Sequence, residues 1–135
     1  MSGEARDLFL GIGADREATA AEVRALAFAA LAEAGLAIDQ VACIASIDLK
    51  AGQVAIRDLA DEFGVPVRFY AAARLEKEMP RLATPSEAVF KQVGCHGVAE
   101  AAALAAGGEA ATLAVPKRKS AHATLAVARF GRRPA

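Results

Sequence analysis

Residues 7–12 read Asp-Leu-Phe-Leu-Gly-Ile, a short apolar run that is followed at once by Gly13. An apolar run of this length that stops at a glycine is typical of a buried strand with a tight turn after it. Thr19 and Glu22 then have the spacing of a capping box, which predicts a helix over residues 20–34. A buried strand followed by an amphipathic helix is the opening unit of an α/β fold.

The alternation of apolar runs and helical segments continues along the rest of the chain. Predicted strands cover residues 41–46, 66–70, 111–115 and 124–130, and predicted helices cover residues 54–63, 72–79, 86–93 and 98–106. Thr84 and Glu87 form a second capping box, so Glu87, like Glu22, is interpreted as a capping residue. The last two strands are joined by about eight residues, too few for a helical crossover, which predicts an antiparallel pair. The sequence therefore predicts an α/β fold: a single three-layer domain with a mixed, mostly parallel sheet, helices on both faces and a C-terminal antiparallel strand pair.

Length and composition place the whole chain, residues 1–135, in one domain. The ends, residues 1–6 and 131–135, carry no pattern that would anchor them, and we expect them to be disordered. No apolar run approaches the ~20 residues that a membrane helix needs, and the N-terminus lacks the apolar centre of a signal peptide. Two cysteines are too few for a disulfide framework, which favours a reducing environment and hence the cytoplasm.

Positive charge is concentrated near the C-terminus, although the net charge of the chain is zero. From residue 114 onward there are six basic residues and no acid: Lys117, Arg118, Lys119, Arg129, Arg132 and Arg133. A neutral chain with few aromatic residues and no Trp does not suit nucleic-acid binding, which needs a broad positive face or stacking side chains. A local basic segment instead suits a pocket for an anionic small molecule.

Three polar clusters follow predicted strands, at residues 11–16, 46–50 and 116–122. In open α/β sheets, ligands bind outside the carboxyl ends of the parallel strands. Each cluster by itself is well explained as an ordinary connection, but three of them at one rim favour a binding site. We therefore expect the three segments to converge.

The first cluster begins with Gly11-Ile12-Gly13. The third glycine of a dinucleotide-binding motif would fall at Arg16, and no clear acidic residue follows at the required distance, so a nucleotide site is disfavoured. Two interpretations stay open for Gly11 and Gly13. They form a tight strand-to-helix turn, or they allow close approach of the backbone to a ligand.

The second cluster, Ser46-Ile47-Asp48-Leu49-Lys50, alternates polar and apolar residues. If the chain stays extended, Ser46, Asp48 and Lys50 point to one side while Ile47 and Leu49 face the core. A surface ion pair would explain the charges but contributes little free energy. The position of the triplet directly after an apolar strand favours ligand binding, with Asp48 and Lys50 also as candidate catalytic residues.

The third cluster, Pro116-Lys117-Arg118-Lys119-Ser120, is the densest basic run in the chain. Lysines suit carboxylate or phosphate oxygens because they act as mobile point charges. The alternative is a solubilising tip on a hairpin, and composition alone favours that alternative.

The cysteines and histidines have simpler explanations than catalysis. Cys95 and His96 are adjacent, but neighbouring side chains in a turn diverge, and no third group is placed to orient the histidine. Together with Cys43 and His122 they match no zinc-binding spacing. We therefore expect neither a metal site nor a cofactor.

Several short segments, taken together and in order, resemble the CobE family, which is similar to the C-terminal domain of CbiG. These segments span nearly the whole chain: Gly11-Ile12-Gly13, Ala45-Ser46-Ile47-Asp48-Leu49-Lys50, Pro85-Ser86-Glu87-Ala88-Val89, Val93-Gly94 with Gly97-Val98-Ala99-Glu100-Ala101-Ala102-Ala103-Leu104, and Val115-Pro116-Lys117 with Lys119-Ser120, Thr124 and Ala126-Val127-Ala128-Arg129. The first loop departs from the family pattern. The family often continues with a cysteine and basic residues, whereas Ala14, Asp15 and Arg16 follow Gly13 here.

The resemblance implies a role in cobalamin (vitamin B12) biosynthesis. CbiG-type proteins open a lactone on the macrocycle of a cobalt-precorrin and release acetaldehyde, whereas CobE-type proteins stand alone and have no settled reaction. This sequence does not include the remainder of CbiG, so hydrolysis does not simply carry over. The leading expectation is a protein that binds a tetrapyrrole, a precorrin or a hydrogenobyrinic-acid-like intermediate, as a carrier or accessory subunit.

Two alternatives stay open beside this one. In the first, the protein is a hydrolase-type enzyme that opens the precorrin lactone, with Asp48 activating water and a lysine stabilising the oxyanion. In the second, it is a docking partner of another pathway enzyme. The expected partners are a corrin or precorrin intermediate and other cobalamin-pathway enzymes, with no nucleic acid and no membrane.

A corrin intermediate is a large, flat, apolar ring fringed by acetate and propionate side chains. The resemblance therefore implies that lysines hold the carboxylates while glycines admit the edge of the ring. The expected substrate-binding residues are Gly11, Gly13, Ser46, Asp48, Lys50, Lys117, Lys119, Ser120 and Thr124.

Overall fold

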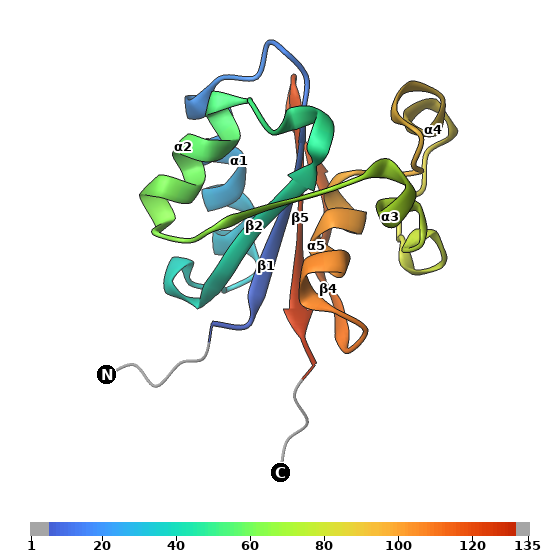
Figure 1. Cartoon of the computed structure of the whole chain (residues 1–135). Helices are drawn as coiled ribbons and strands as arrows, with labels where there is room; N and C mark the ends of the chain where they lie inside the picture. Colours follow the sequence, from blue (N-terminus) through green and yellow to red (C-terminus); the bar gives the residue numbers. More distant parts are fainter. Residues whose placement is uncertain (1–5, 132–135) are drawn as a thin grey trace.

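A five-stranded sheet forms the centre of the structure, a computed structural model that describes residues 6–131 (Figure 1). Its strands are β1 (Leu8–Ala14), β2 (Val41–Ile47), β3 (Val67–Tyr70), β4 (Ala111–Lys119) and β5 (Ala123–Phe130), in the spatial order β3-β2-β1-β5-β4. β2 pairs in parallel with β1 and β3, whereas β5 pairs antiparallel with β1 and β4. Four strands therefore run in one direction and β5 alone in the other. This brings the carboxyl ends of β1, β2 and β4 to the same rim.

Helices cover both faces of the sheet. α1 (Ala20–Glu33) and α2 (Val54–Phe63) pack on one face, and α5 (Ala99–Gly107) packs on the other. α3 (Ala72–Glu76) and α4 (Glu87–Val93) extend the side on which α5 lies (Figure 1). The three layers, the mixed sheet and the C-terminal antiparallel pair predicted from the sequence are confirmed.

Small residues allow α5 to lie close to the sheet. Four of its alanines, Ala99, Ala101, Ala102 and Ala103, are buried. At Gly11, in the middle of β1, an added Cβ would overlap the carbonyl oxygen of Ala99. Gly11 therefore permits a close approach of strand and helix rather than a turn. Its place beneath α5 keeps it out of the pocket described below, contrary to the expectation that it contacts substrate.

Most predicted boundaries differ by one or two residues from those of the structure, and three differences concern the site or its surroundings. The strand predicted over residues 111–115 continues to Lys119, because β4 is an edge strand, where Pro116 without an N–H is tolerated. The helix predicted over residues 72–79 ends at Glu76, and a 3₁₀ turn follows. α4 begins at Glu87 and is capped by Ser86 rather than by Thr84, since the Ser86 hydroxyl accepts the N–H of Val89 at 3.2 Å.

The two ends of the described chain are both hydrogen-bonded. The Arg6 side chain donates to the carbonyl oxygen of Val41 at 3.0 Å. The N–H of Gly131 donates to the carbonyl oxygen of Ala110 at 3.0 Å. Residues 1–5 and 132–135, with Arg132 and Arg133, lie outside the described residues. Within residues 6–131, no helix is long and apolar enough to cross a membrane.

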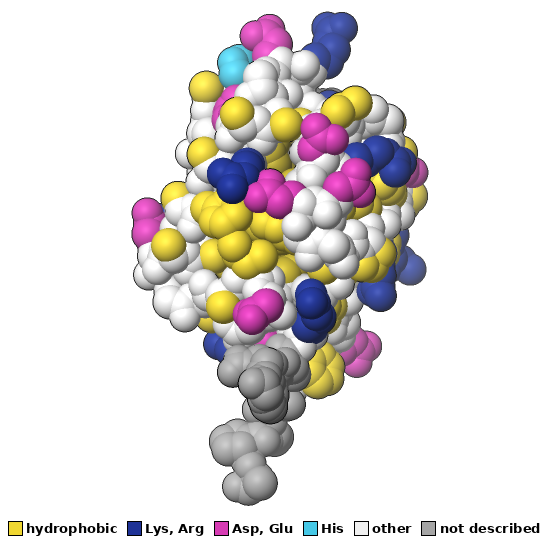
Figure 2. Space-filling model, turned by 90° about the vertical axis from the view of Figure 1, so that its left-hand side faces the viewer, with side chains coloured by type: hydrophobic (Ala, Val, Ile, Leu, Met, Phe, Trp, Pro, Cys, Tyr) yellow, Lys and Arg dark blue, Asp and Glu magenta, His cyan; other side chains and the backbone are white. Residues whose placement is uncertain are grey.

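The outer side of α1 and α2 carries both apolar and charged groups (Figure 2). Phe28 of α1 packs edge-on against Phe63 of α2, with 5.7 Å between ring centroids. Arg24 lies over the Phe28 ring and forms an ion pair with Glu62 at 2.9 Å. These contacts join the two helices on the side of the sheet opposite to α5.

Candidate functional site

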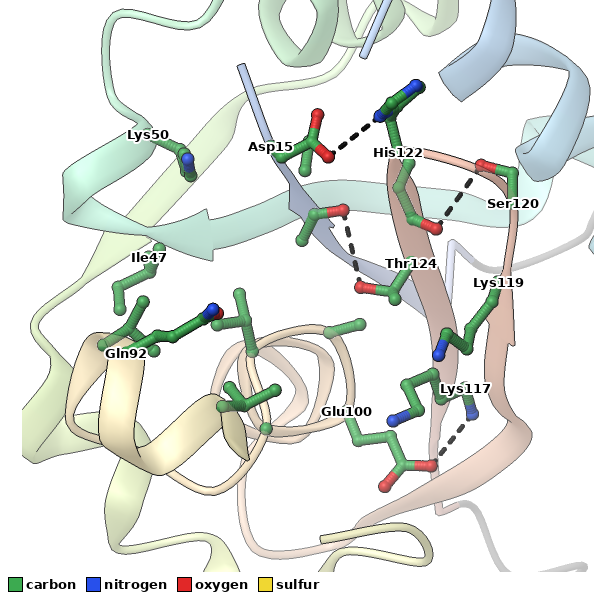
Figure 3. Close-up of a pocket in the computed structure, with 18 of the residues that line it drawn as sticks. Asp15, Ile47, Lys50, Gln92, Glu100, Lys117, Lys119, Ser120, His122 and Thr124 are labelled. Carbon is green, nitrogen blue, oxygen red and sulfur yellow. Dashed lines mark hydrogen bonds and ion pairs between the residues drawn. The ribbon is translucent and has the colours of Figure 1, made fainter. Parts of the chain in front are cut away.

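A pocket of about 420 Å³ lies at the rim where β1, β2 and β4 end (Figure 3). The loop after β1, the turn after β2, the β4–β5 hairpin, α4 and the start of α5 each contribute to its walls. The three polar segments predicted to converge therefore do so. The pocket is lined by Gly13, Ala14, Asp15, Ile47, Lys50, Thr84, Val89, Gln92, Val93, Gly97, Val98, Ala99, Glu100, Lys117, Lys119, Ser120, Ala121, His122, Ala123 and Thr124.

Three lysines bring positive charge into this pocket. Lys117 and Lys119 are two residues apart on β4 and both line it, whereas Arg118 points to the opposite face and pairs with Glu33 of α1 at 2.6 Å. Lys50 reaches the pocket from the turn after β2. In the described part of the chain, none of the three ammonium groups forms an ion pair.

The segment after β2 does not stay extended, which was the condition for Ser46, Asp48 and Lys50 to point to one side. Residues Asp48–Lys50 form a 3₁₀ turn, in which the N–H of Ala51 donates to the carbonyl oxygen of Asp48 at 3.0 Å. The turn brings Lys50 to the pocket but leaves Asp48 exposed and outside it. Leu49, expected in the core, is 66% exposed. The candidate catalytic pair Asp48 and Lys50 is therefore not presented together.

Ser46 is a structural residue in this fold. It is fully buried, and its hydroxyl donates to the carbonyl oxygen of Ile12 at 2.6 Å, which links β2 to β1. It does not line the pocket, contrary to the expectation that it contacts substrate. Burial of a hydroxyl requires such a partner, and the neighbouring strand supplies one.

The remaining expected residues, Gly13, Ser120 and Thr124, do line the pocket. The Thr124 hydroxyl donates to the carbonyl oxygen of Gly13 at 3.4 Å, and a Cβ at Gly13 would lie 2.7 Å from that hydroxyl. The Ser120 hydroxyl donates to the carboxylate of Glu22. Both hydroxyl oxygens keep lone pairs that can accept a hydrogen bond from a ligand.

Glu100 is a site residue that the sequence analysis gave no role. Glu100 is 2% exposed, and its carboxylate accepts three backbone N–H groups, from Ala83 at 2.9 Å, Thr84 at 3.0 Å and Lys117 at 2.9 Å. A register shift in the β4–β5 ladder between Val115 and Arg118 leaves Lys117 out of strand pairing, so its N–H is available to Glu100. One signal was present in the sequence: Glu100 is the only charge in an alanine-rich helix.

Asp15, Glu22 and His122 form a second group that the sequence analysis missed. The His122 ring Nδ1 lies 2.9 Å from Asp15 Oδ2, and the His122 backbone N–H donates to Glu22 at 2.6 Å. The hydrogen bond with Asp15 raises the pKa of His122, and the same bond lowers the pKa of Asp15. Hydrogen bonds from Ser120 and from the N–H of His122 lower the pKa of Glu22. The N–H of Glu22 donates to the hydroxyl of Thr19, as the capping box predicts, but the Glu22 carboxylate accepts the N–H of His122 in the hairpin turn.

Cys95 and His96 do not form a nucleophile–base pair. The His96 ring lies between Glu76 at 2.7 Å and Glu87 at 3.1 Å and stacks on Phe90 with 4.4 Å between centroids. Cys95 is buried, which raises the pKa of its thiol. Glu87 thus contacts His96 instead of closing a capping box. Within residues 6–131, no group of three or more His, Cys, Asp or Glu residues is placed to hold a metal ion.

Known proteins match this chain along most of its length. The family described as "Cobalamin synthesis G C-terminus" matches residues 8–128. Protein CobE from Sinorhizobium sp is 53% identical over 121 residues, which cover 90% of this chain and 79% of that protein. Cobalt-precorrin-5A hydrolase from Priestia megaterium is 32% identical over 121 residues, and the chain spans 32% of its length.

Solved structures agree with the sequence matches. The crystal structure of CobE, a protein from the cobalamin (vitamin B12) biosynthetic pathway, superimposes with a TM-score of 0.87 and 38% identity, covering 94% of this chain and 92% of that chain. The resemblance inferred from the sequence is thereby confirmed. The chain belongs to the cobalamin synthesis G C-terminus family, and it is a cobalamin biosynthesis protein related to CobE and to the C-terminal part of CbiG.

Proposed function

We propose that this protein binds a corrin or precorrin intermediate resembling hydrogenobyrinic acid and acts as its carrier or as an accessory subunit. The observation that carries the proposal is the placement of Lys50 on one wall of the pocket and of Lys117 and Lys119 on another. None of these lysines is neutralised by a carboxylate of the described chain. An ammonium group without an ion-pair partner is available for a charge-assisted hydrogen bond to a ligand carboxylate.

Apolar side chains occupy the space between these charges. Ile47, Val89, Val93 and Val98 line the pocket together with small residues. A flat ring with apolar faces and carboxylates along its edges is complementary to such a surface. The volume of about 420 Å³ lies at the low end of the range for drug-sized ligands, and a tetrapyrrole is larger. We therefore propose that one edge of the ring enters and the rest stays exposed, which suits a carrier that passes its ligand on.

A visible titration tests this proposal. Hydrogenobyrinic acid is added to the purified protein, and the absorption band of the ring is followed until it stops changing. We expect a saturable shift of that band at about one ligand per chain. An unchanged band with up to about millimolar protein would contradict the proposal, because that result would leave less than about 4 kcal/mol of binding free energy.

The relationship to cobalt-precorrin-5A hydrolase supports a second candidate, hydrolysis of a precorrin lactone. The base proposed from the sequence, Asp48, lies outside the pocket. Of the acids that line it, Asp15 is bonded to His122 and Glu100 accepts three backbone N–H groups. The geometry therefore favours binding over hydrolysis. Incubation with cobalt-precorrin-5A distinguishes a hydrolase from a carrier. A hydrolase opens the lactone and releases acetaldehyde, whereas a carrier returns the ligand unchanged.

A docking partner of another pathway enzyme is the remaining alternative. It predicts neither ring binding nor turnover by the chain alone.

We place the function in the cytoplasm, because Cys43 and Cys95 are both unpaired and buried, as expected where thiols stay reduced.

A further inference from the structure

Hydrogen bonds join two walls of the pocket at its rim. The turn between β4 and β5 contains Ser120 and His122, and the loop after β1 contains Asp15. The N–H of Asp15 donates to the carbonyl oxygen of His122 at 2.9 Å, while its carboxylate lies 2.9 Å from the His122 ring (Figure 3). Glu22 of α1 accepts the backbone N–H of His122 and the hydroxyl of Ser120. The turn that forms part of one wall is thereby tied to both β1 and α1.

Three carboxylates surround the His122 ring at this turn. Asp15 and Glu17 face it from the loop after β1, with 3.8 Å between its Nε2 and Glu17, and Glu22 faces it from α1. Lys119, on the same hairpin, lines the pocket without pairing to these acids. The hydrogen bond with Asp15 raises the pKa of His122, so the ring keeps its proton to a higher pH than a free histidine would. Its charge offsets part of the negative charge at the rim.

We propose that Asp15, Glu22 and His122 are positioning residues of the ligand site, which hold the hairpin turn in place and, through the charge on His122, set how strongly the rim repels an anionic ligand. The inference rests on the proposed function, because it concerns the affinity of that same pocket. When His122 loses its proton, the carboxylates of Asp15, Glu17 and Glu22 stay charged beside the carboxylates of the ligand. Affinity for a polycarboxylate then falls.

The direction of the pH dependence follows from the charge on His122. The positive charge is fully present below the ordinary histidine pKa of 6.5 and is lost as the pH rises through the higher value of the folded protein. Carboxyl groups of the ligand, with ordinary pKa values of about 4, stay ionised over this range. Affinity should therefore be highest near pH 6 and lower near pH 9. The rim is exposed to solvent, so we expect a decrease of about threefold.

The two histidines of the chain provide a matched pair of variants. His96 also lies between two carboxylates, Glu76 and Glu87, but it does not line the pocket. Hydrogenobyrinic acid is titrated into the wild type, His122→Gln and His96→Gln at constant ionic strength between about pH 6 and pH 9. We expect the affinity of the wild type and of His96→Gln to fall about threefold as the pH is raised over this range. The affinity of His122→Gln should not change with pH and should equal the lower, high-pH affinity of the wild type. His122→Lys, which keeps a positive charge, should retain the low-pH affinity throughout.

Three outcomes would overturn the inference, and they can be told apart. If His122→Gln keeps the pH slope of the wild type, the protein still binds but His122 does not set its affinity. If the wild type binds at no pH, the proposed function fails and the inference with it. An NMR titration of the protein without ligand adds a folded-state check: the His122 ring should titrate above the ordinary value of 6.5 in the wild type and lower in Asp15→Asn. Equal midpoints in the two proteins would contradict the role of Asp15.

Discussion

Two segments deliver lysines to the pocket, and the chain holds them in different ways. Lys117 and Lys119 lie on β4, which pairs with β5 as far as Lys119, and Glu100 accepts the N–H of Lys117. Lys50 lies in a 3₁₀ turn that begins where β2 stops pairing, beyond the contact of Ile47 with β3. The strand segment is thus held by β5 and by Glu100. The turn is held by local hydrogen bonds, from the N–H of Gln53 to the carbonyl oxygen of Lys50 at 2.9 Å and from Arg57 to that of Ala51 at 2.6 Å.

The difference shows what strand pairing does for a binding site. Along β4 the backbone stays extended to Lys119, so alternate side chains, Lys117 and Lys119, reach the pocket and Arg118 between them faces α1. Beyond β2 the chain forms a 3₁₀ turn, which presents the single lysine of this segment, Lys50, to the pocket. We infer that the β4 lysines contribute most of the affinity and that Lys50 supplies a smaller share.

The largest effect is expected from removing the anchor of the strand segment. Glu100→Ala leaves three backbone N–H groups without their acceptor, at a cost of about 3 kcal/mol or more in the free energy of unfolding. Glu33→Ala removes an exposed carboxylate that contacts the same strand through Arg118 and should cost less than about 1 kcal/mol. Urea denaturation measures both. Equal losses would mean that Glu100 does not anchor β4.

Replacing the two β4 lysines should weaken ligand binding without unfolding the protein. In Lys117→Ala with Lys119→Ala, loss of two charge-assisted contacts should lower the affinity for hydrogenobyrinic acid by at least about tenfold. The salt dependence of binding should also become less steep. Arg118→Ala, a change in the same strand on the opposite face, should leave the affinity within about twofold. A folded double variant that binds as tightly as the wild type would reduce the basic run to a solubilising segment.

Ser46→Ala separates fold from binding. The Ser46 hydroxyl is buried and bonded to Ile12, so its loss should lower the free energy of unfolding by about 1 kcal/mol. The affinity for the ring should be unchanged, since Ser46 does not line the pocket. Thermal unfolding and a ring titration measure the two quantities. Weaker binding with unchanged stability would restore the ligand-contact role expected from the sequence.

The smallest effect is expected at the turn after β2. Lys50→Ala removes one charge, against two in the β4 double variant, and should weaken binding by about threefold. Asp48→Ala, two residues earlier and outside the pocket, should change neither binding nor any turnover of cobalt-precorrin-5A. A larger loss from Lys50→Ala than from the β4 pair would reverse the order proposed above.

Much of the fold could be predicted from local sequence patterns. The apolar runs marked every strand, the α2 helix was placed at its observed bounds of 54–63, and the convergence of three loops followed from their position after strands. The conformation of residues 48–50 could not be predicted from their alternation alone, because it depends on whether a partner strand continues beside them. The role of Gly11 also depends on α5, which lies on top of it only in the folded chain.

Contacts between distant residues account for the parts of the site that were missed. Asp15 and His122 are separated by 107 positions, and Glu22 and Ser120 by 98, so no local spacing links them. Glu22 had a complete local explanation as a capping residue, which hid its contact with the hairpin. Glu100 was visible as a charge in an apolar helix, but the N–H groups that donate to it belong to two other segments, at Ala83 and Lys117.

An NMR titration with hydrogenobyrinic acid tests the central claim most directly, which is that one ligand contacts both lysine segments. Backbone amide shifts are followed in the isotope-labelled protein as the ring is added. We predict that Lys50 and the residues from Lys117 to Thr124 shift together with the same saturation midpoint, while residues on the outer side of α1 and α2 do not. Shifts confined to one lysine segment, or centred on the outer side of α1 and α2, would contradict the account.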